Sequence, residues 1–177
     1  MSPAGPELAG RSSSGRFPCW KPTVMTIFEE APKPEFEHLL TDKARQAFAL
    51  GFARAREDGA AEFNGLYLLY GILSLRTCTA RTILRVLAGS IEPLEAALLR
   101  VLPRSRATGE PSRPVESAEI RGILRSALEL ARGSGPIGTG HLLLPVAREG
   151  NGVAELLEGV GISLPALHRA VARHTRR

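Results

Sequence analysis

Residues 137–167, IGTGHLLLPVAREGNGVAELLEGVGISLPAL, combine three helix starts with glycine-rich breaks. Thr139 comes just before the apolar run 141–147. It is an N-cap candidate, because its hydroxyl can accept a hydrogen bond from the first turn of a helix. The start of this stretch therefore predicts a short, buried helix.

The second half of the stretch predicts two more helices. The run 149–152, EGNG, ends the first helix, because glycine and asparagine tolerate a left-handed backbone at little cost. Apolar residues then return at helical spacing over 153–160. Gly161 ends this helix, Ser163 can cap the next one, and Pro165 suits its first turn, where no N–H is needed.

Earlier in the chain, the same signals predict four helices. They cover residues 41–57, 65–75, 79–87 and 92–101. Thr41 can cap the first helix, whose apolar face carries small residues and therefore predicts a close neighbour. The second helix is apolar nearly all round, which indicates a central position.

The two halves of the chain repeat one plan. After the segment 103–114, PRSRATGEPSRP, Ser117 caps a helix that resembles the first one at an offset of 76 residues. Tyr67 then falls on His141 at an offset of 74, and the fourth helices match at 73. We therefore predict an all-α fold, in which two pseudo-symmetric four-helix repeats pack as one eight-helix domain.

The domain boundaries follow from composition. Residues 1–34 are rich in Pro, Gly and Ser and form a predicted disordered or loosely ordered tail. The predicted domain covers 35–177, with repeat one at 35–102, the linker at 103–114 and repeat two at 115–177.

Composition bounds the class of protein. The chain is 44% hydrophobic and 23% charged, and it has no apolar run long enough to span a bilayer. Two cysteines without a metal-binding spacing fit a reducing compartment, so we expect a cytoplasmic protein. We also expect a monomer that does not bind membranes. The net charge of +5 permits nucleic-acid or acidic partners, but no aromatic residues alternate with the arginines to stack bases.

Three strings in the second half carry a family resemblance. They are GTGHLLL at 138–144, REGNGVA at 148–154 and GISL at 161–164. In this order they resemble the double repeat of the N-terminal domain of Clp-type AAA+ unfoldases, which has GTEH-like, EGEGVA-like and GISL-like strings. The resemblance implies a stand-alone copy of that domain, so that any ATPase activity would belong to a partner.

The resemblance also implies a binding surface. In some members of the family, the glutamate of the GTEH string and nearby threonines bind phosphorylated arginine. Thr41 and Ser117 match the threonine at the start of each repeat, whereas Leu66 and Gly140 replace the glutamate. The loss of both charges predicts a more apolar groove, suited to a hydrophobic segment, an adaptor helix or a cyclic peptide. The expected peptide- or partner-binding residues are Thr41, Leu66, Tyr67, Ser117, Thr139, Gly140 and His141.

Signals for chemistry are weak. The sequence has no nucleophile motif and no nucleotide-binding loop, and 150–152 is explained as a turn. His141 could be a ligand or a base, but no carboxylate or cysteine lies three or four residues away. We therefore expect it to be a structural histidine with one backbone hydrogen bond, and we expect no catalytic residue, metal or cofactor.

The leading hypothesis is a non-enzymatic protein- or peptide-binding module, accessory or adaptor to a Clp protease or chaperone. Its partners would be protein or peptide ligands and Clp ATPase or protease subunits. A decoy that sequesters ligands of the unfoldase, including cyclic peptides, is the first alternative. A helical nucleic-acid-binding protein is the second, and an enzyme of unrecognised type is the third.

Overall fold

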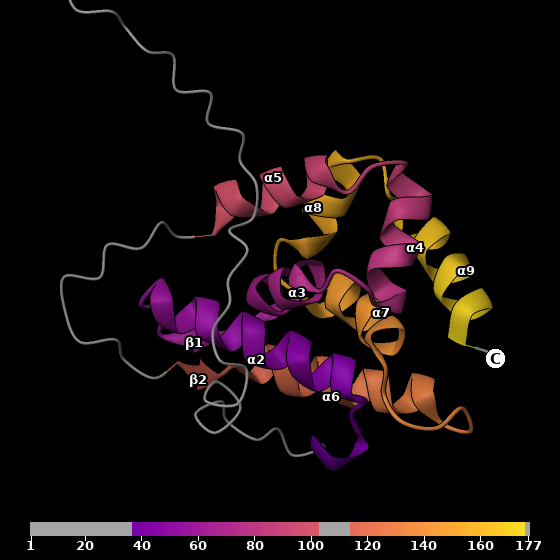
Figure 1. The fold of residues 1–177 in the computed structure, drawn as a ribbon, viewed down its shortest axis with the longest axis horizontal. Helices are drawn as coiled ribbons and strands as arrows, with labels where there is room; N and C mark the ends of the chain where they lie inside the picture. The colour runs from indigo at the N-terminus through magenta and orange to yellow at the C-terminus, as the bar shows by residue number, and fades with distance from the viewer. Residues whose placement is uncertain (1–36, 103–113, 176–177) are drawn as a thin grey trace, which may run out of the picture.

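The computed structural model describes residues 37–102 and 114–175, and in these ranges each repeat forms four α-helices (Figure 1). Repeat one contains α2 (Asp42–Glu57), α3 (Gly65–Ser74), α4 (Thr79–Ala88) and α5 (Glu92–Val101). Repeat two contains α6 (Ala118–Ala131), α7 (Thr139–Glu149), α8 (Val153–Gly159) and α9 (Leu164–Thr175). A 3-10 helix η1 (Glu37–Leu39) and the short strands β1 (Glu62–Phe63) and β2 (Val115–Glu116) complete the described elements.

This architecture confirms the all-α prediction with two four-helix repeats. The predicted tail 1–34 lies outside the described residues, as does the predicted linker except for Pro114. The proposed boundaries between tail, repeats and linker therefore stay predictions.

Three of the predicted helix caps are confirmed, and one is wrong. The hydroxyls of Thr41, Ser117 and Ser163 accept hydrogen bonds from the backbone N–H three residues on, at 3.3, 3.3 and 3.4 Å. Thr139 is not an N-cap: Gly138 holds that position in extended backbone, and Thr139 is the first residue of α7. The Thr139 hydroxyl instead bonds to a different helix, a partner that local sequence does not reveal.

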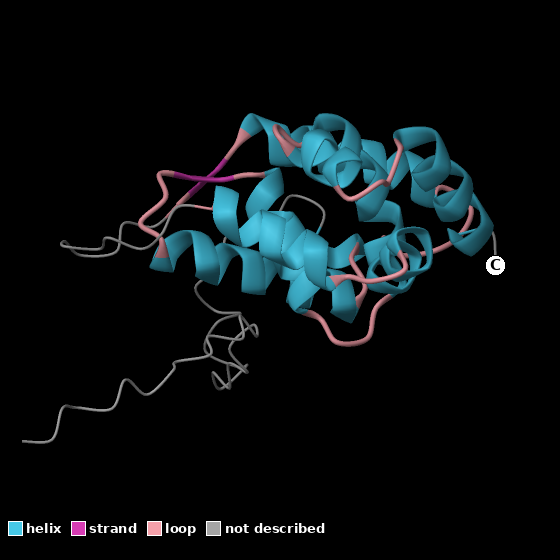
Figure 2. Cartoon of the chain, turned by 90° about the horizontal axis from the view of Figure 1, so that it is seen from above, coloured by secondary structure: helices cyan, strands magenta, loops and turns pink. Residues whose placement is uncertain are grey.

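The repeats exchange backbone hydrogen bonds at the segments that enter their helices. The Thr41 N–H, before α2, donates to the Ile137 carbonyl, before α7, at 3.0 Å. The equivalent Ser117 N–H, before α6, donates to the Phe63 carbonyl, before α3, at 3.2 Å. Around the second bond β1 and β2 pair in parallel (Figure 2). Sequence patterns did not predict this pairing, because each strand has only two residues.

The helices of the two repeats also interlock. α3 and α7 lie at the centre and contact one another, while α4 packs against α9 and α5 against α8 (Figure 1). Each of these outer pairs joins one helix from each repeat. One buried apolar cluster runs through both repeats, so each half completes the core of the other.

Two glycines allow α2 and α3 to pack with their backbones in contact. A Cβ on Gly71 would lie 1.9 Å from the Ala47 carbonyl oxygen, and one on Gly51 would lie 2.4 Å from the Tyr67 carbonyl oxygen. Both separations are far below van der Waals contact, so no side chain fits at either position. The small residues on the apolar face of α2 thus have the close neighbour that the sequence predicted.

None of the described helices is long and apolar enough to cross a membrane.

Gly71→Ala should lower the free energy of unfolding by at least about 3 kcal/mol, because the added methyl group meets backbone that cannot move aside. Gly159→Ala is the matched control. Its Cβ meets nothing within 4 Å at the end of α8, and we expect a gain of up to about 1 kcal/mol from helix propensity. Urea unfolding of both variants measures the difference. Equal stability of Gly71→Ala and the parent chain would contradict the backbone contact.

Candidate functional site

The structure sorts the predicted site residues into two clusters, each built from both repeats. Thr41 of repeat one joins Thr139, Gly140 and His141 of repeat two, because its backbone pairs with the segment before α7. A Cβ on Gly138 would lie 4.0 Å from the Thr41 methyl group. We call this region the α4–α7 junction.

Ser117 of repeat two correspondingly joins Leu66 and Tyr67 of repeat one, through the bond from its N–H to the Phe63 carbonyl. We call this region the α3–α8 junction. Of the seven predicted residues, Tyr67, Ser117, Thr139, Gly140 and His141 are buried, while Thr41 and Leu66 are half-buried. Most of the predicted residues therefore lie below the surface and support the junctions; they are not exposed to a ligand.

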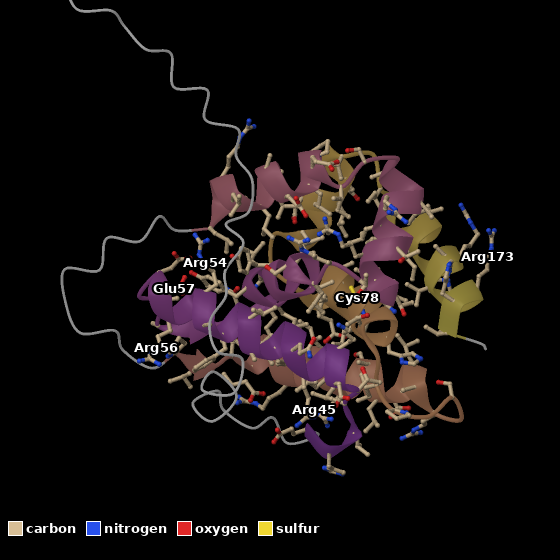
Figure 3. The ribbon with its side chains drawn as sticks, in the orientation of Figure 1. Arg45, Arg54, Arg56, Glu57, Cys78 and Arg173 are labelled. Carbon is tan, nitrogen blue, oxygen red and sulfur yellow. The ribbon has the colours of Figure 1, made fainter. Side chains whose placement is uncertain are left out.

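At the α4–α7 junction, the N-termini of two helices meet. The Thr139 hydroxyl oxygen, in the first turn of α7, accepts a hydrogen bond from the Ala80 N–H, in the first turn of α4, at 3.3 Å. This bond satisfies one of the N–H groups that a helix start leaves without an intrahelical acceptor. Cys78, labelled in Figure 3, caps the same helix, since its sulfur accepts from the Arg81 N–H at 3.4 Å.

Gly140 lies at the centre of the α4–α7 junction. A Cβ on Gly140 would lie 3.1 Å from the methyl carbon of Thr79, at the start of α4, and 3.5 Å from that of Thr175, at the end of α9. A longer side chain at position 140 would have to push these threonines aside. The Gly140 backbone is therefore buried at the centre of the junction, with threonines at the rim: Thr79 is exposed, and Thr41 and Thr175 are half-buried.

The α3–α8 junction has the same backbone framework, but different side chains lie at it. The Glu119 carboxylate, from α6, accepts a hydrogen bond from the Gly65 N–H at 2.6 Å and another from the Asn151 side chain at 3.0 Å. A carboxylate is favoured at the start of α3, because the free N–H groups there carry partial positive charge. The chain's own anion thus occupies this junction, with Leu66 beside it.

Sequence reasoning missed Glu119. It lies in the first turn of α6, where an acidic residue is ordinary. Its partner Gly65 is 54 residues away, so no local pattern could join the two.

His141 makes the structural backbone bond that the sequence predicted. Its Nδ1 accepts from the Gly138 N–H at 3.0 Å, and its Nε2 lies 3.2 Å from the Ser134 hydroxyl oxygen. That hydroxyl donates its proton to the Ala131 carbonyl at 2.9 Å, so the bond to His141 assigns the ring proton to Nε2. A neutral ring satisfies every bond, and burial lowers the pKa of His141 below its ordinary value.

Tyr67 occupies the equivalent place in repeat one. Burial, followed by the negative charge of Asp58, raises the pKa of Tyr67 to about 12, so the phenol is neutral at physiological pH. Asp58 is the counterpart of Ser134 at the offset of 76 and accepts from Arg54 Nε at 2.8 Å. Each repeat thus places a polar residue after its first helix near the third residue of its second helix.

The groups at the two junctions suit recognition. Hydroxyls, backbone amides and small apolar surfaces can bind a polypeptide segment through hydrogen bonds and apolar contact. Across 37–102 and 114–175, the His, Cys, Asp and Glu side chains form no group of three that could hold a metal ion.

Comparison with known sequences and folds gives a consistent result. The family model described as the Clp repeat (R) N-terminal domain matches residues 39–160. The chain is 28% identical to the chaperone protein ClpC2, chloroplastic, of Arabidopsis thaliana, over 179 residues that cover 97% of this chain. The match spans only 19% of that relative.

Solved structures show the same fold at low identity. The N-terminal domain of Hsp104 from Candida albicans superimposes with a TM-score of 0.66 at 15% identity, covering 78% of this chain and 93% of that one. The N-terminal domain of ClpD from Arabidopsis thaliana gives a TM-score of 0.58 at 19% identity, covering 79% and 96%.

The neutral state of His141 predicts a loss of stability in acid. Because its pKa in the folded chain lies below the ordinary value of 6.5, the unfolded chain binds this proton first as the pH falls. The stabilisation is therefore present above pH 6.5 and is lost below it. The free energy of unfolding of His141→Asn, measured across this pH range, should change less with pH than that of the parent chain. The difference in slope corresponds to at most one bound proton. His168→Asn, the same substitution at an exposed position of α9, is the matched control. Equal slopes in all three chains would contradict the assignment.

Proposed function

Because the chain belongs to the Clp repeat N-terminal domain family, we propose that it is a protein-binding module that captures segments of other proteins at the α4–α7 junction. The captured segment belongs to a substrate or an adaptor of a Clp-type unfoldase. The chain acts beside that unfoldase as an accessory factor. Its location is the cytoplasm, as expected from the sequence, although the matched relative is chloroplastic.

The choice of the α4–α7 junction over the α3–α8 junction rests on one observation. The two junctions share a framework, but Glu119 and Asn151 occupy the α3–α8 junction, whereas Gly140 places no side chain at the α4–α7 junction. The threonine rim offers hydroxyl donors and acceptors together with methyl groups. Such a surface suits an extended polypeptide, which presents backbone N–H and carbonyl groups between its side chains.

The nucleic-acid alternative has less support. Residues 37–102 and 114–175 contain 14 Lys and Arg against 13 Asp and Glu, a net charge of +1 out of the +5 of the whole chain. Nucleic-acid binding depends on a strongly positive surface to replace the counterions of the phosphates. The helical body is close to neutral, which favours a protein ligand.

A labelled, permanently unfolded protein such as reduced and carboxymethylated α-lactalbumin tests this function by fluorescence anisotropy. We expect the 177-residue chain to bind it, and Thr79→Phe to weaken binding at least about tenfold, which corresponds to about 1.4 kcal/mol. The added ring would cover the rim of the junction. Ala96→Phe, at an exposed position of α5, is the matched control and should bind as the parent does.

Two results would count against the proposal. Absence of binding by the parent chain would remove the protein-binding function. Equal binding by Thr79→Phe and Ala96→Phe would remove the α4–α7 junction as its site.

A further inference from the structure

Charge is segregated between the two outer helix pairs. α4 and α9 together contain four arginines and no Asp or Glu. In the repeat alignment, α4 corresponds to α8 and α9 to α5. The pair formed by α5 and α8 contains four glutamates and one arginine. The duplicated scaffold therefore presents a basic pair and an acidic pair.

The basic pair begins at the α4–α7 junction. Thr79, the first residue of α4, and Thr175, the last residue of α9, both approach Gly140, so the two helices run antiparallel along one another (Figure 1). Arg169 lies on α9 six residues before Thr175, about 9 Å along the helix from the junction. Arg85 lies on α4 four residues after Arg81 and therefore shares its face, which is turned towards α5.

Arg173 extends the same surface. It lies one turn from Arg169 on α9, and positions four residues apart share a helix face. Figure 3 shows Arg173 on the outer side of α9, at the edge of the molecule. We call Arg169 and Arg173 the arginine face.

Within the described residues, no acidic side chain neutralises the arginine face. Both side chains are exposed, and neither makes an ion pair with another described residue. Arg81 on α4 differs, because it is half-buried and bonds to the Glu95 carboxylate at 2.6 Å. Arg81 thus joins α4 to α5, whereas the arginine face is directed to solvent.

We propose that the arginine face continues the α4–α7 junction and selects protein segments rich in Asp and Glu. The inference rests on the proposed protein-binding function and names its ligand class. Arginine matches carboxylates in charge and in planar geometry, so an acidic segment leaving the junction along α9 gains ion pairs that a neutral segment lacks.

A nucleic acid fits this surface less well than an acidic polypeptide. α4 and α9 have no Phe, Tyr or Trp on which a base could stack. A second copy of the chain could place its acidic pair against the arginine face, but this contact would be head-to-tail. Such a contact leaves an unpaired basic face at one end of the assembly and an unpaired acidic face at the other. An acidic segment of another protein has neither difficulty.

Anisotropy titrations of the full chain test the inference with three labelled probes. The first is a short peptide of Glu, Ser and Leu, the second replaces each Glu by Lys, and the third is single-stranded DNA. We expect the acidic peptide to bind most tightly and to weaken as the salt concentration rises. Arg169→Glu with Arg173→Glu should weaken its binding at least about fivefold, because both ion pairs are reversed.

Arg121→Glu with Arg125→Glu, an exposed pair with the same spacing on α6, is the matched control. It makes the same change of net charge and should bind the acidic peptide within about twofold of the parent. Circular dichroism of both double variants verifies that they are folded.

Three outcomes would overturn the inference. They are equal affinity for the acidic and basic peptides, an equal loss in the control variant, or tighter binding of the DNA than of the acidic peptide. Concentration-dependent self-association that is lost only in the Arg169→Glu, Arg173→Glu variant would assign the surface to a second copy instead. If the unfolded protein still binds while the acidic preference is absent, only this inference fails. If neither binds, the proposed function fails too.

Discussion

The fold depends on hydrogen bonds that the two repeats exchange at their helix entries. Buried backbone N–H and carbonyl groups must be paired, and here Thr41 uses Ile137 while Ser117 uses Phe63. Neither repeat can satisfy these groups alone, and neither can cover its central helix. The same exchange decides which residues meet, because it places the start of one repeat beside the second helix of the other. Both junctions are therefore products of the pairing between repeats.

Divergence within this symmetric frame is the basis of the proposed function. Glu119 neutralises the helix start at one junction, whereas Gly140 leaves backbone and threonines at the other. The outer helix pairs differ in the same way, since one is basic and the other acidic. A duplicated scaffold begins with two equivalent surfaces. Changes in a few side chains make one surface part of the fold and leave the other as the proposed binding surface.

The buried polar residues behind the junctions show how much of the site the sequence could predict. His141 was expected to make one backbone bond and does so, because its capping partner Gly138 is only three residues away. Its second partner, Ser134, lies in the turn after the first helix of repeat two. Asp58 lies at the corresponding place in repeat one and approaches Tyr67, because the chain turns back there towards its second helix. Thr139 was assigned to the wrong role, since its acceptor function serves α4, 59 residues earlier.

Sequence alone determined the helices, their order and the duplication, because capping side chains, glycine stops and apolar spacing all act within a few residues along the chain. It also determined the absence of the motif glutamates at positions 66 and 140. Tertiary structure decided which helices from opposite repeats pack together, which site residues are buried and which junction Glu119 fills. These features depend on contacts between residues tens of positions apart. Periodicity specifies that a face is apolar, but only the packed molecule specifies what covers it.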